Sequence, residues 1–244
     1  MKRLDVSSAA LHVLGMAFMV CDHIWGLFGG PVWMPCIGRL AFPIFAFLAV
    51  EGYFHTGNLR RYISRLLIFA AVSEIPFNFM YSGVAFYPVH QNTLWTLLIG
   101  LGFIAMIERV KSAGKRWKTV LVVVGAVVLG FVAGMATMVD YYGAGVLTVL
   151  VFYLFRGRKW WCFLGQLVCL CYLNVEVLGG LYYPVTVLGR YFELHQQSLA
   201  LLALIPIWLY RGRQGYHSKR FQYFCYAFYP VHILAITLVF RAVV

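Results

Sequence analysis

Residues 16–56 read MAFMVCDHIWGLFGGPVWMPCIGRLAFPIFAFLAVEGYFHT, two apolar runs joined by a short turn at Gly29–Val32. The ionisable side chains of Asp22, His23, Arg39 and Glu51 lie within these apolar runs. A charged side chain at the centre of a membrane helix costs about 2.5–3.5 kcal/mol even on a lenient insertion scale, so such residues usually pair, line a wet cavity or act in chemistry. The stretch therefore predicts two antiparallel membrane helices that carry a polar site.

The composition of the whole chain supports a membrane protein. Of 244 residues, 62% are hydrophobic and only 11% are charged, and the mean hydropathy is +0.80, whereas soluble domains have about 45–50% apolar and about 25% charged residues. The net charge of +12 would suit nucleic acid only on the surface of a soluble domain. No such domain is visible, so we expect no nucleic-acid partner.

The fold class predicted is all-α, a polytopic membrane helix bundle of about nine transmembrane helices. Each predicted span is an apolar run close to the roughly 20 residues that cross a bilayer. The sixth and eighth are the shortest. The spans cover residues 8–28, 33–54, 61–81, 91–109, 119–139, 141–156, 160–178, 194–210 and 221–241.

Seventeen of the 20 Lys and Arg lie in alternate loops or at the N-terminus. Because basic loops stay in the cytoplasm, this pattern places the N-terminus inside and, with an odd number of spans, the C-terminus outside. We expect a multi-pass membrane protein, with membrane lipid as one partner. The basic N-terminal residues are Lys2 and Arg3.

Small residues recur every fourth position in the fifth span, at Ala126, Gly130 and Gly134. Such a stripe lets another helix approach closely, within one chain or in a homo-oligomer. The six cysteines include no C-x-x-C pair, so we expect free, buried thiols. The histidines His90, His195 and His232 have no partners at metal-ligand spacing, and no metal is expected.

His23 is the strongest candidate for chemistry. Histidine accepts protons near neutral pH, and Arg39, in the neighbouring antiparallel span, is suited to hold a carbonyl oxygen, a carboxylate or Asp22 itself. A histidine that only bonds a backbone carbonyl is the alternative. We expect Asp22, His23 and Arg39 to be catalytic.

A second group lies at the inner end of the second and third spans. It consists of Glu51, His55, Arg60, Arg61 and Arg65. These residues suit the mouth of a site for an anionic cytoplasmic ligand. Structural ion pairs, topology signals and attraction to anionic lipid are the alternatives.

Polar residues also lie at the outer ends of later spans and, in one case, within the ninth span. His90, Asn92, Asp140, Tyr141 and His232 are expected to bind substrate, although Asn92 and Asp140 are also typical helix N-caps. His232 follows Pro230, where a break in the helix would expose polar backbone to a cavity.

Several blocks of the sequence together resemble the TraX family, membrane proteins named for the acetylation of conjugative pilin. The blocks cover most of the chain: VCDHI at 20–24, IGRLAFPIFAFLAVEGYFHTGN at 37–58, YISRLLIFAAVSEIPFN at 62–78, NTLWTLLIG at 92–100, DYYGAGVL at 140–147, LALIPIWLYRGRQG at 202–215 and FCYAFYPVHIL at 224–234.

The resemblance implies that residues 1–244 form a single integral-membrane acyltransferase-like domain in the bacterial cytoplasmic (inner) membrane. Cytoplasmic acetyl-CoA would donate its acetyl group to an amine or hydroxyl reached from the other side of the membrane, such as a pilin-like N-terminus, another peptide or an envelope molecule. His23 would be the catalytic base, with Arg39 steadying the oxyanion and Asp22 orienting the histidine through a neighbouring helix. An acetyl-histidine intermediate is the alternative route.

Two other classes of function are alternatives. A transporter or flippase of a small anionic solute would also have buried charges and a wet path, but nine spans do not divide into equal inverted repeats, and no matched pair of broken helices occurs in two halves of the chain. A non-catalytic partner in pilus assembly would need no buried Asp-His-Arg set.

Overall fold

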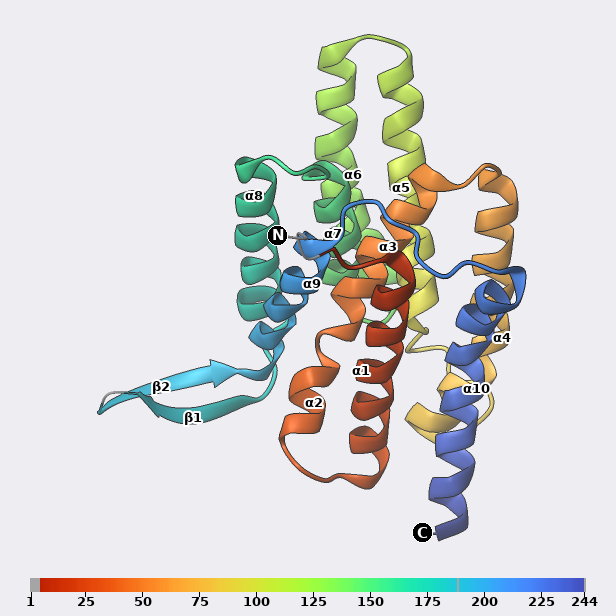
Figure 1. Ribbon diagram of the computed structural model, residues 1–244, viewed down its shortest axis with the longest axis vertical. Coiled ribbons are helices and arrows are strands. Elements are labelled where there is room, and N and C mark those ends of the chain that lie inside the picture. The colour runs from red at the N-terminus through yellow and green to blue at the C-terminus, as the bar shows by residue number, and fades with distance from the viewer. Residues whose placement is uncertain (1–4, 188, 244) are drawn as a thin grey trace.

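The apolar runs form helices at the predicted positions in the computed structural model, which describes residues 5–187 and 189–243 (Figure 1). The helices are α1 (Ser8–Phe28), α2 (Trp33–Gly38), α3 (Ala41–His55), α4 (Leu59–Ser82), α5 (Thr93–Ser112), α6 (Arg116–Ala136), α7 (Tyr142–Leu154), α8 (Trp160–Tyr172), α9 (Leu204–Leu209) and α10 (Lys219–Val243). A π-helical segment, η1 (Leu173–Val177), extends α8, and a 3-10 segment, η2 (Gln196–Ala203), precedes α9.

Within the described residues, seven helices are long and apolar enough to cross a membrane: α1, the joined α2 and α3, α4, α5, α6, the joined α8 and η1, and α10. The two shorter apolar helices are α7 and the joined η2 and α9. These are the sixth and eighth predicted spans. The prediction of an all-α, polytopic membrane protein is therefore confirmed.

The turns gather at two opposite ends of the bundle (Figure 1). The turns α3–α4, α5–α6 and α7–α8 lie at the end that we call the basic end. These turns, the helix ends beside them and residues 211–220 carry most of the Lys and Arg. The α1–α2 turn, the strands and the C-terminus lie toward the other end, called here the hairpin end. This separation agrees with the alternation of charge along the sequence. Lys2 and Arg3 lie outside the described residues.

Helices α3 and α7 form the centre of the bundle. Nine residues of α7 and eight of α3 are buried, against three in α6, so α7 is covered on nearly all sides while α6 presents an apolar surface. The predicted small-residue stripe faces this centre: a Cβ at Gly130 would meet Val146 at 3.2 Å, and one at Gly134 would meet the backbone of Gly143 at 2.8 Å. The stripe thus packs α6 against α7 within one chain.

The loop between η1 and η2 contains an antiparallel hairpin that the sequence did not predict. Strand β1 (Tyr182–Val187) pairs with β2 (Arg190–His195), with Tyr182 opposite His195. The hairpin projects sideways from the bundle (Figure 1). All six cysteines are free, as predicted, but only Cys162 is fully buried and Cys171 is exposed.

Candidate functional site

One large cavity, of about 1360 Å³, runs through the bundle. Residues of α1 line it from Ser8 to Leu27, a length of about 28 Å at 1.5 Å per residue. At the basic end its wall includes Ser8, His12, Glu51, His55, Arg65, Gln214, Tyr216, His217, Lys219 and Gln222. At the hairpin end its wall includes Asp22, His23, Arg39, Tyr81, His90, Asp140, Tyr141 and Gln197. The cavity therefore joins the two groups of residues that the sequence analysis singled out.

Asp22 and Arg39 form an ion pair across two helices. Arg39 Nη2 donates a hydrogen bond to Asp22 Oδ1, and the two side chains are 18% (Asp22) and 24% (Arg39) exposed. Arg39 lies at the turn between α2 and α3, where Gly38 allows α1 to approach. A Cβ at Gly38 would overlap the Asp22 side chain. The pair thus depends on a glycine as well as on its two charged members.

A chain of amides continues from Arg39 into the bundle. Arg39 Nη1 donates to Gln197 Oε1 at 3.5 Å, and Gln197 Nε2 donates to Asn174 Oδ1 at 3.0 Å. Gln197 and Asn174 are buried and come from η2 and the π-helical segment η1. The sequence analysis missed both, although a buried amide in an apolar run was a signal of the same kind as Asp22. Arg39 Nε is buried without a hydrogen-bond partner among the described residues.

His23 contacts His232 of α10, not Asp22. His23 Nδ1 lies 2.8 Å from His232 Nε2, and the two rings are nearly parallel, with an interplanar angle of 6°. The sequence placed Asp22 beside His23, but adjacent residues of a helix point in different directions. The structure therefore divides the predicted catalytic set into an Asp22–Arg39 pair and a His23–His232 pair.

Helix α10 runs unbroken through Pro230, so the helix break considered at this proline does not occur. His232 lies one turn beyond Phe228 and its Nδ1 is 2.7 Å from the Phe228 carbonyl oxygen. Its side chain is buried, and it is not part of the cavity wall. Both ring nitrogens of His232 thus contact protein groups.

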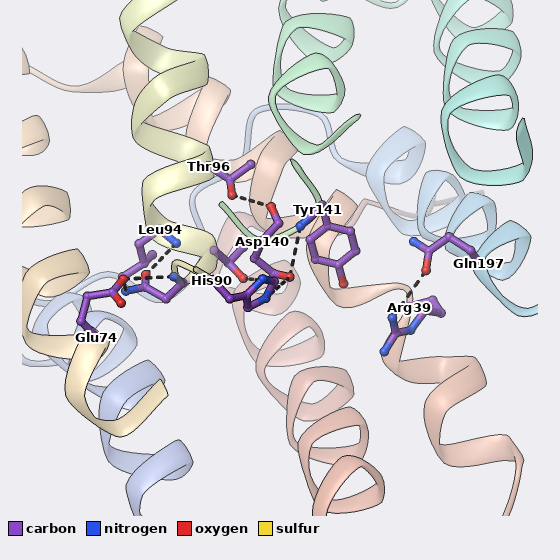
Figure 2. A network of polar contacts seen from close by, with 10 residues as sticks. Arg39, Glu74, His90, Leu94, Thr96, Asp140, Tyr141 and Gln197 are labelled. Carbon is purple, nitrogen blue, oxygen red and sulfur yellow. Dashed lines mark hydrogen bonds and ion pairs between the residues drawn. The ribbon is translucent and has the colours of Figure 1, made fainter. Parts of the chain in front are cut away.

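Asp140 is the centre of a third polar cluster (Figure 2). Its carboxylate accepts hydrogen bonds from Thr93 Oγ1 and, at 3.1 Å, from the Tyr141 backbone N–H, while its carbonyl accepts from Thr96 Oγ1 at 2.6 Å. His90 Nε2 lies 3.7 Å from Asp140 Oδ1. Asp140, His90 and Tyr141 all line the cavity, so these three predicted substrate-binding residues lie together.

The backbone of this cluster is strained. Tyr141 and Tyr142 have φ of 60° and 46°, a left-handed conformation that non-glycine residues adopt rarely and that concentrates at functional sites. Tyr141 is the N-cap of α7, so Asp140, which was expected as a cap, lies one residue before that position. The hydrogen bonds of Asp140 help to hold the strained turn.

Asn92 has a structural role. It is fully buried, caps α5 by accepting from the Leu94 N–H at 3.0 Å, and donates through Nδ2 to Glu74 Oε1 and to the Ala70 carbonyl. Figure 2 shows Glu74 reaching this helix end. Asn92 is not part of the cavity wall, so the capping alternative describes it.

The residues predicted to form a site at the inner end of the second and third spans are divided as well. Glu51, His55 and Arg65 line the cavity, whereas Arg60 and Arg61 are exposed outside it. Glu51 Oε1 accepts from Arg156 Nε at 2.7 Å, so Glu51 forms a structural ion pair. Arg65 forms no ion pair within the described part of the chain, and its Nε is buried without a partner. Lys219, which the sequence analysis did not single out, lines the same mouth.

Comparisons with known proteins agree with this architecture. The family model described as TraX protein matches residues 7–240. A curated relative from Dichelobacter nodosus, named probable fimbrial assembly protein FimC of serogroup H1, is 25% identical over 249 residues, which cover 95% of each chain. No solved structure matches the chain. Since the family model covers nearly the whole sequence, this multi-pass membrane protein belongs to the TraX family.

Proposed function

We propose that the protein is an acetyltransferase that moves an acetyl group from cytoplasmic acetyl-CoA to an amine or hydroxyl on the other side of the membrane. The observation that carries this proposal is the single cavity that joins His23 to the basic mouth. A donor entering at one end and an acceptor entering at the other would meet within it. The excess of Lys and Arg at the basic end supports placing that end in the cytoplasm.

The donor fits the inner half of the cavity. Arg65 and Lys219 lie at the mouth, and neither has a carboxylate partner in residues 5–187 or 189–243, so their charges are available for the phosphates of CoA. The apolar wall that follows includes Met16, Phe45 and Leu97, which suits the pantetheine arm. Its thioester would then approach His23. His55 lines the same mouth, and Arg60 and Arg61, outside the wall, would add a weaker positive potential.

The chemical step is a direct transfer. The unprotonated nitrogen of His23 removes a proton from the acceptor amine or hydroxyl. At the same time, a lone pair of the acceptor nitrogen or oxygen forms a bond to the thioester carbonyl carbon. The resulting oxyanion is stabilised by the positive charge of Arg39, which lines the cavity. When the tetrahedral intermediate collapses, the carbon–sulfur bond breaks, and the proton held by His23 passes to the departing thiolate of CoA. Asp22 neutralises and positions Arg39.

The acceptor would approach from the hairpin end, where His90, Asp140 and Tyr141 line the cavity. The relative from Dichelobacter nodosus is named a probable fimbrial assembly protein, and this supports a pilin-like N-terminus as the acceptor. For the location we propose a bacterial inner membrane, which the membrane-spanning length of the helices and the basic end both suit.

A transporter or flippase of a small anionic solute is the second candidate, because a cavity lined from both ends also suits alternating access. The two functions differ in one respect that can be measured. A transferase makes and breaks covalent bonds and needs His23 as a base, whereas a transporter delivers its solute unchanged.

The test combines binding and transfer in the purified protein. We expect CoA to raise the melting temperature of the wild type and labelled acetyl-CoA to acetylate a short peptide with a free N-terminal amine. His23→Gln should lower transfer by roughly 10²- to 10⁴-fold and keep the thermal shift with CoA. His195→Gln, the same change at a histidine outside the cavity wall, should have little effect. Full activity of His23→Gln, or a wild type that neither binds CoA nor transfers acetyl groups to amine or hydroxyl peptides, would overturn the proposal.

A further inference from the structure

We propose that His232 is a positioning residue that fixes the tautomer of His23, so that His23 carries its proton on Nδ1 and presents a bare Nε2 to the cavity. This inference rests on the proposed function, in which His23 is the base. It assigns His232 a role different from the substrate contact expected from the sequence. Three steps of hydrogen-bond geometry lead to it.

The first step concerns His232 Nδ1. This atom lies 2.7 Å from the carbonyl oxygen of Phe228, one turn earlier in α10. A carbonyl oxygen only accepts hydrogen bonds, so His232 Nδ1 must carry a proton and donate it. The helix itself thus sets the protonated nitrogen of His232.

The second step concerns the charge of His232. Its side chain is buried, and it has no acidic partner within 4.0 Å in the described part of the chain. A buried charge without a partner is costly, so the ring is neutral. A neutral imidazole with a proton on Nδ1 has an unprotonated Nε2, which can only accept a hydrogen bond.

The third step passes this constraint to His23. His232 Nε2 and His23 Nδ1 are 2.8 Å apart, so His23 Nδ1 must be the donor and must carry the proton. His23 Nε2 then has a free lone pair. This nitrogen has no hydrogen-bond partner in the described residues and is not buried away from the cavity. The chain of bonds thus runs from the Phe228 carbonyl through His232 to a base that faces the cavity.

Packing holds the two rings in this geometry. The ring centroids of His23 and His232 are 5.0 Å apart, with an interplanar angle of 6°. Phe228 stacks on His232 with a centroid distance of 4.8 Å and an interplanar angle of 13°. His232 is only 8% exposed and lies outside the cavity wall that includes His23. His232 therefore cannot reach a substrate in the cavity and can act only through His23.

The consequence is a division of labour between the two polar pairs. In a catalytic histidine, the partner of one nitrogen decides which nitrogen is the base. A carboxylate often serves as that partner, but here Asp22 is engaged with Arg39. A second, neutral histidine takes the place of the carboxylate and needs no charge beside the base.

The test uses two substitutions at residue 232 and one control. In His232→Gln the amide oxygen can occupy the place of Nε2 and accept from His23, whereas His232→Leu fills the space without an acceptor. Thr237→Val is the control, because Thr237 is buried in the same helix and bonds only the Ile233 carbonyl at 2.8 Å. Each protein is first tested for thermal stability and for stabilisation by CoA, which a folded variant should retain.

We expect His232→Leu to lower kcat by roughly 10- to 100-fold, the usual effect of removing a partner that orients a histidine, with KM for acetyl-CoA nearly unchanged. His232→Gln should recover most of the loss and Thr237→Val should match the wild type. Nitrogen NMR of labelled histidine, with the His23 signals identified by their loss in His23→Gln, should show a protonated Nδ1 and a bare Nε2 in the wild type. In His232→Leu this tautomer should no longer dominate.

The two measurements separate this inference from the proposed function. If the wild type transfers acetyl groups but His23 carries its proton on Nε2, or if His232→Leu keeps full kcat, the positioning role is wrong and the transferase stands. If the wild type transfers nothing but the NMR spectrum shows the predicted tautomer, the hydrogen-bond chain is supported and the chemistry assigned to it is wrong.

Discussion

The two ends of the cavity are built differently. At the hairpin end, Asp22, His23 and Arg39 each have a protein partner, and the side chains of the ion pair are 18% and 24% exposed. At the basic end, Arg65 and Lys219 have no ion-pair partner in the described residues, and Lys219 is exposed.

This difference separates two tasks. Partnered side chains are already held in place, so they stabilise a transition state without reorganising. Unpartnered long basic side chains provide attraction for an anion but little fixed geometry. We therefore expect substitutions at the hairpin end to lower kcat and substitutions at the basic end to raise KM for acetyl-CoA.

After the loss expected in His23→Gln, the next largest effect is expected at the Asp22–Arg39 pair. Arg39→Gln removes the charge that would stabilise the oxyanion and should lower kcat by roughly 10²- to 10³-fold. Asp22→Asn should also lower kcat, since it releases Arg39 from its position. Because the two residues act as a unit, the double variant should be no worse than Arg39→Gln. Kinetics of all four proteins would show this, and additive losses would mean that Asp22 acts independently of Arg39.

A smaller effect is expected from the glycine between these partners. In Gly38→Ala the new Cβ would overlap Asp22, so α1 and α2 must separate and the ion pair must lengthen. We expect kcat to fall by roughly 10-fold, since small misplacements at a reacting centre are costly, and the melting temperature to fall as well. Gly102→Ala, at a helical glycine with open space around its Cβ, is the matched control. Wild-type kcat in Gly38→Ala would show that the close approach is unnecessary.

The smallest effect is expected at the basic end and should appear in KM. Arg65→Gln and Lys219→Gln should each raise KM for acetyl-CoA by roughly 10-fold and leave kcat nearly unchanged. A tenfold change is about 1.4 kcal/mol, close to the lower end of the roughly 1.5–3 kcal/mol of a hydrogen bond to a charged group. Arg60→Gln and Arg61→Gln should change KM less than twofold, because these side chains lie outside the cavity wall and salt screens them. Equal effects of all four would indicate general attraction at the surface and no defined phosphate site.

The sequence predicted the helices well, because apolar runs of spanning length leave few alternatives to a helix in a membrane. It also identified Asp22, His23 and Arg39, since ionisable residues in hydrocarbon stand out. It did not predict which of them pair. That outcome depends on the turn at Arg39 and on contact between His23 and His232, which are 209 positions apart in the sequence. No local sequence pattern predicts a contact over such a separation.

The remaining differences have similar causes. The strands at Tyr182–His195 lie in a loop with no clear alternation of apolar and polar residues, so no strand period marks them. The sequence does not mark Gln197 and Asn174 as site residues, because amides carry no charge and are less unusual in an apolar run than a carboxylate such as Asp22. Asn92 was recognised as a possible cap, and its capping bond to the Leu94 N–H bears this out.

The central claim is that one cavity brings together a donor from one side of the membrane and an acceptor from the other. Its most direct test is transfer across proteoliposomes of defined orientation, with labelled acetyl-CoA on the side of the basic end and an amine peptide on the opposite side. We predict label on the peptide with the wild type and almost none with His23→Gln. Transfer only when peptide and acetyl-CoA share one side would contradict the claim.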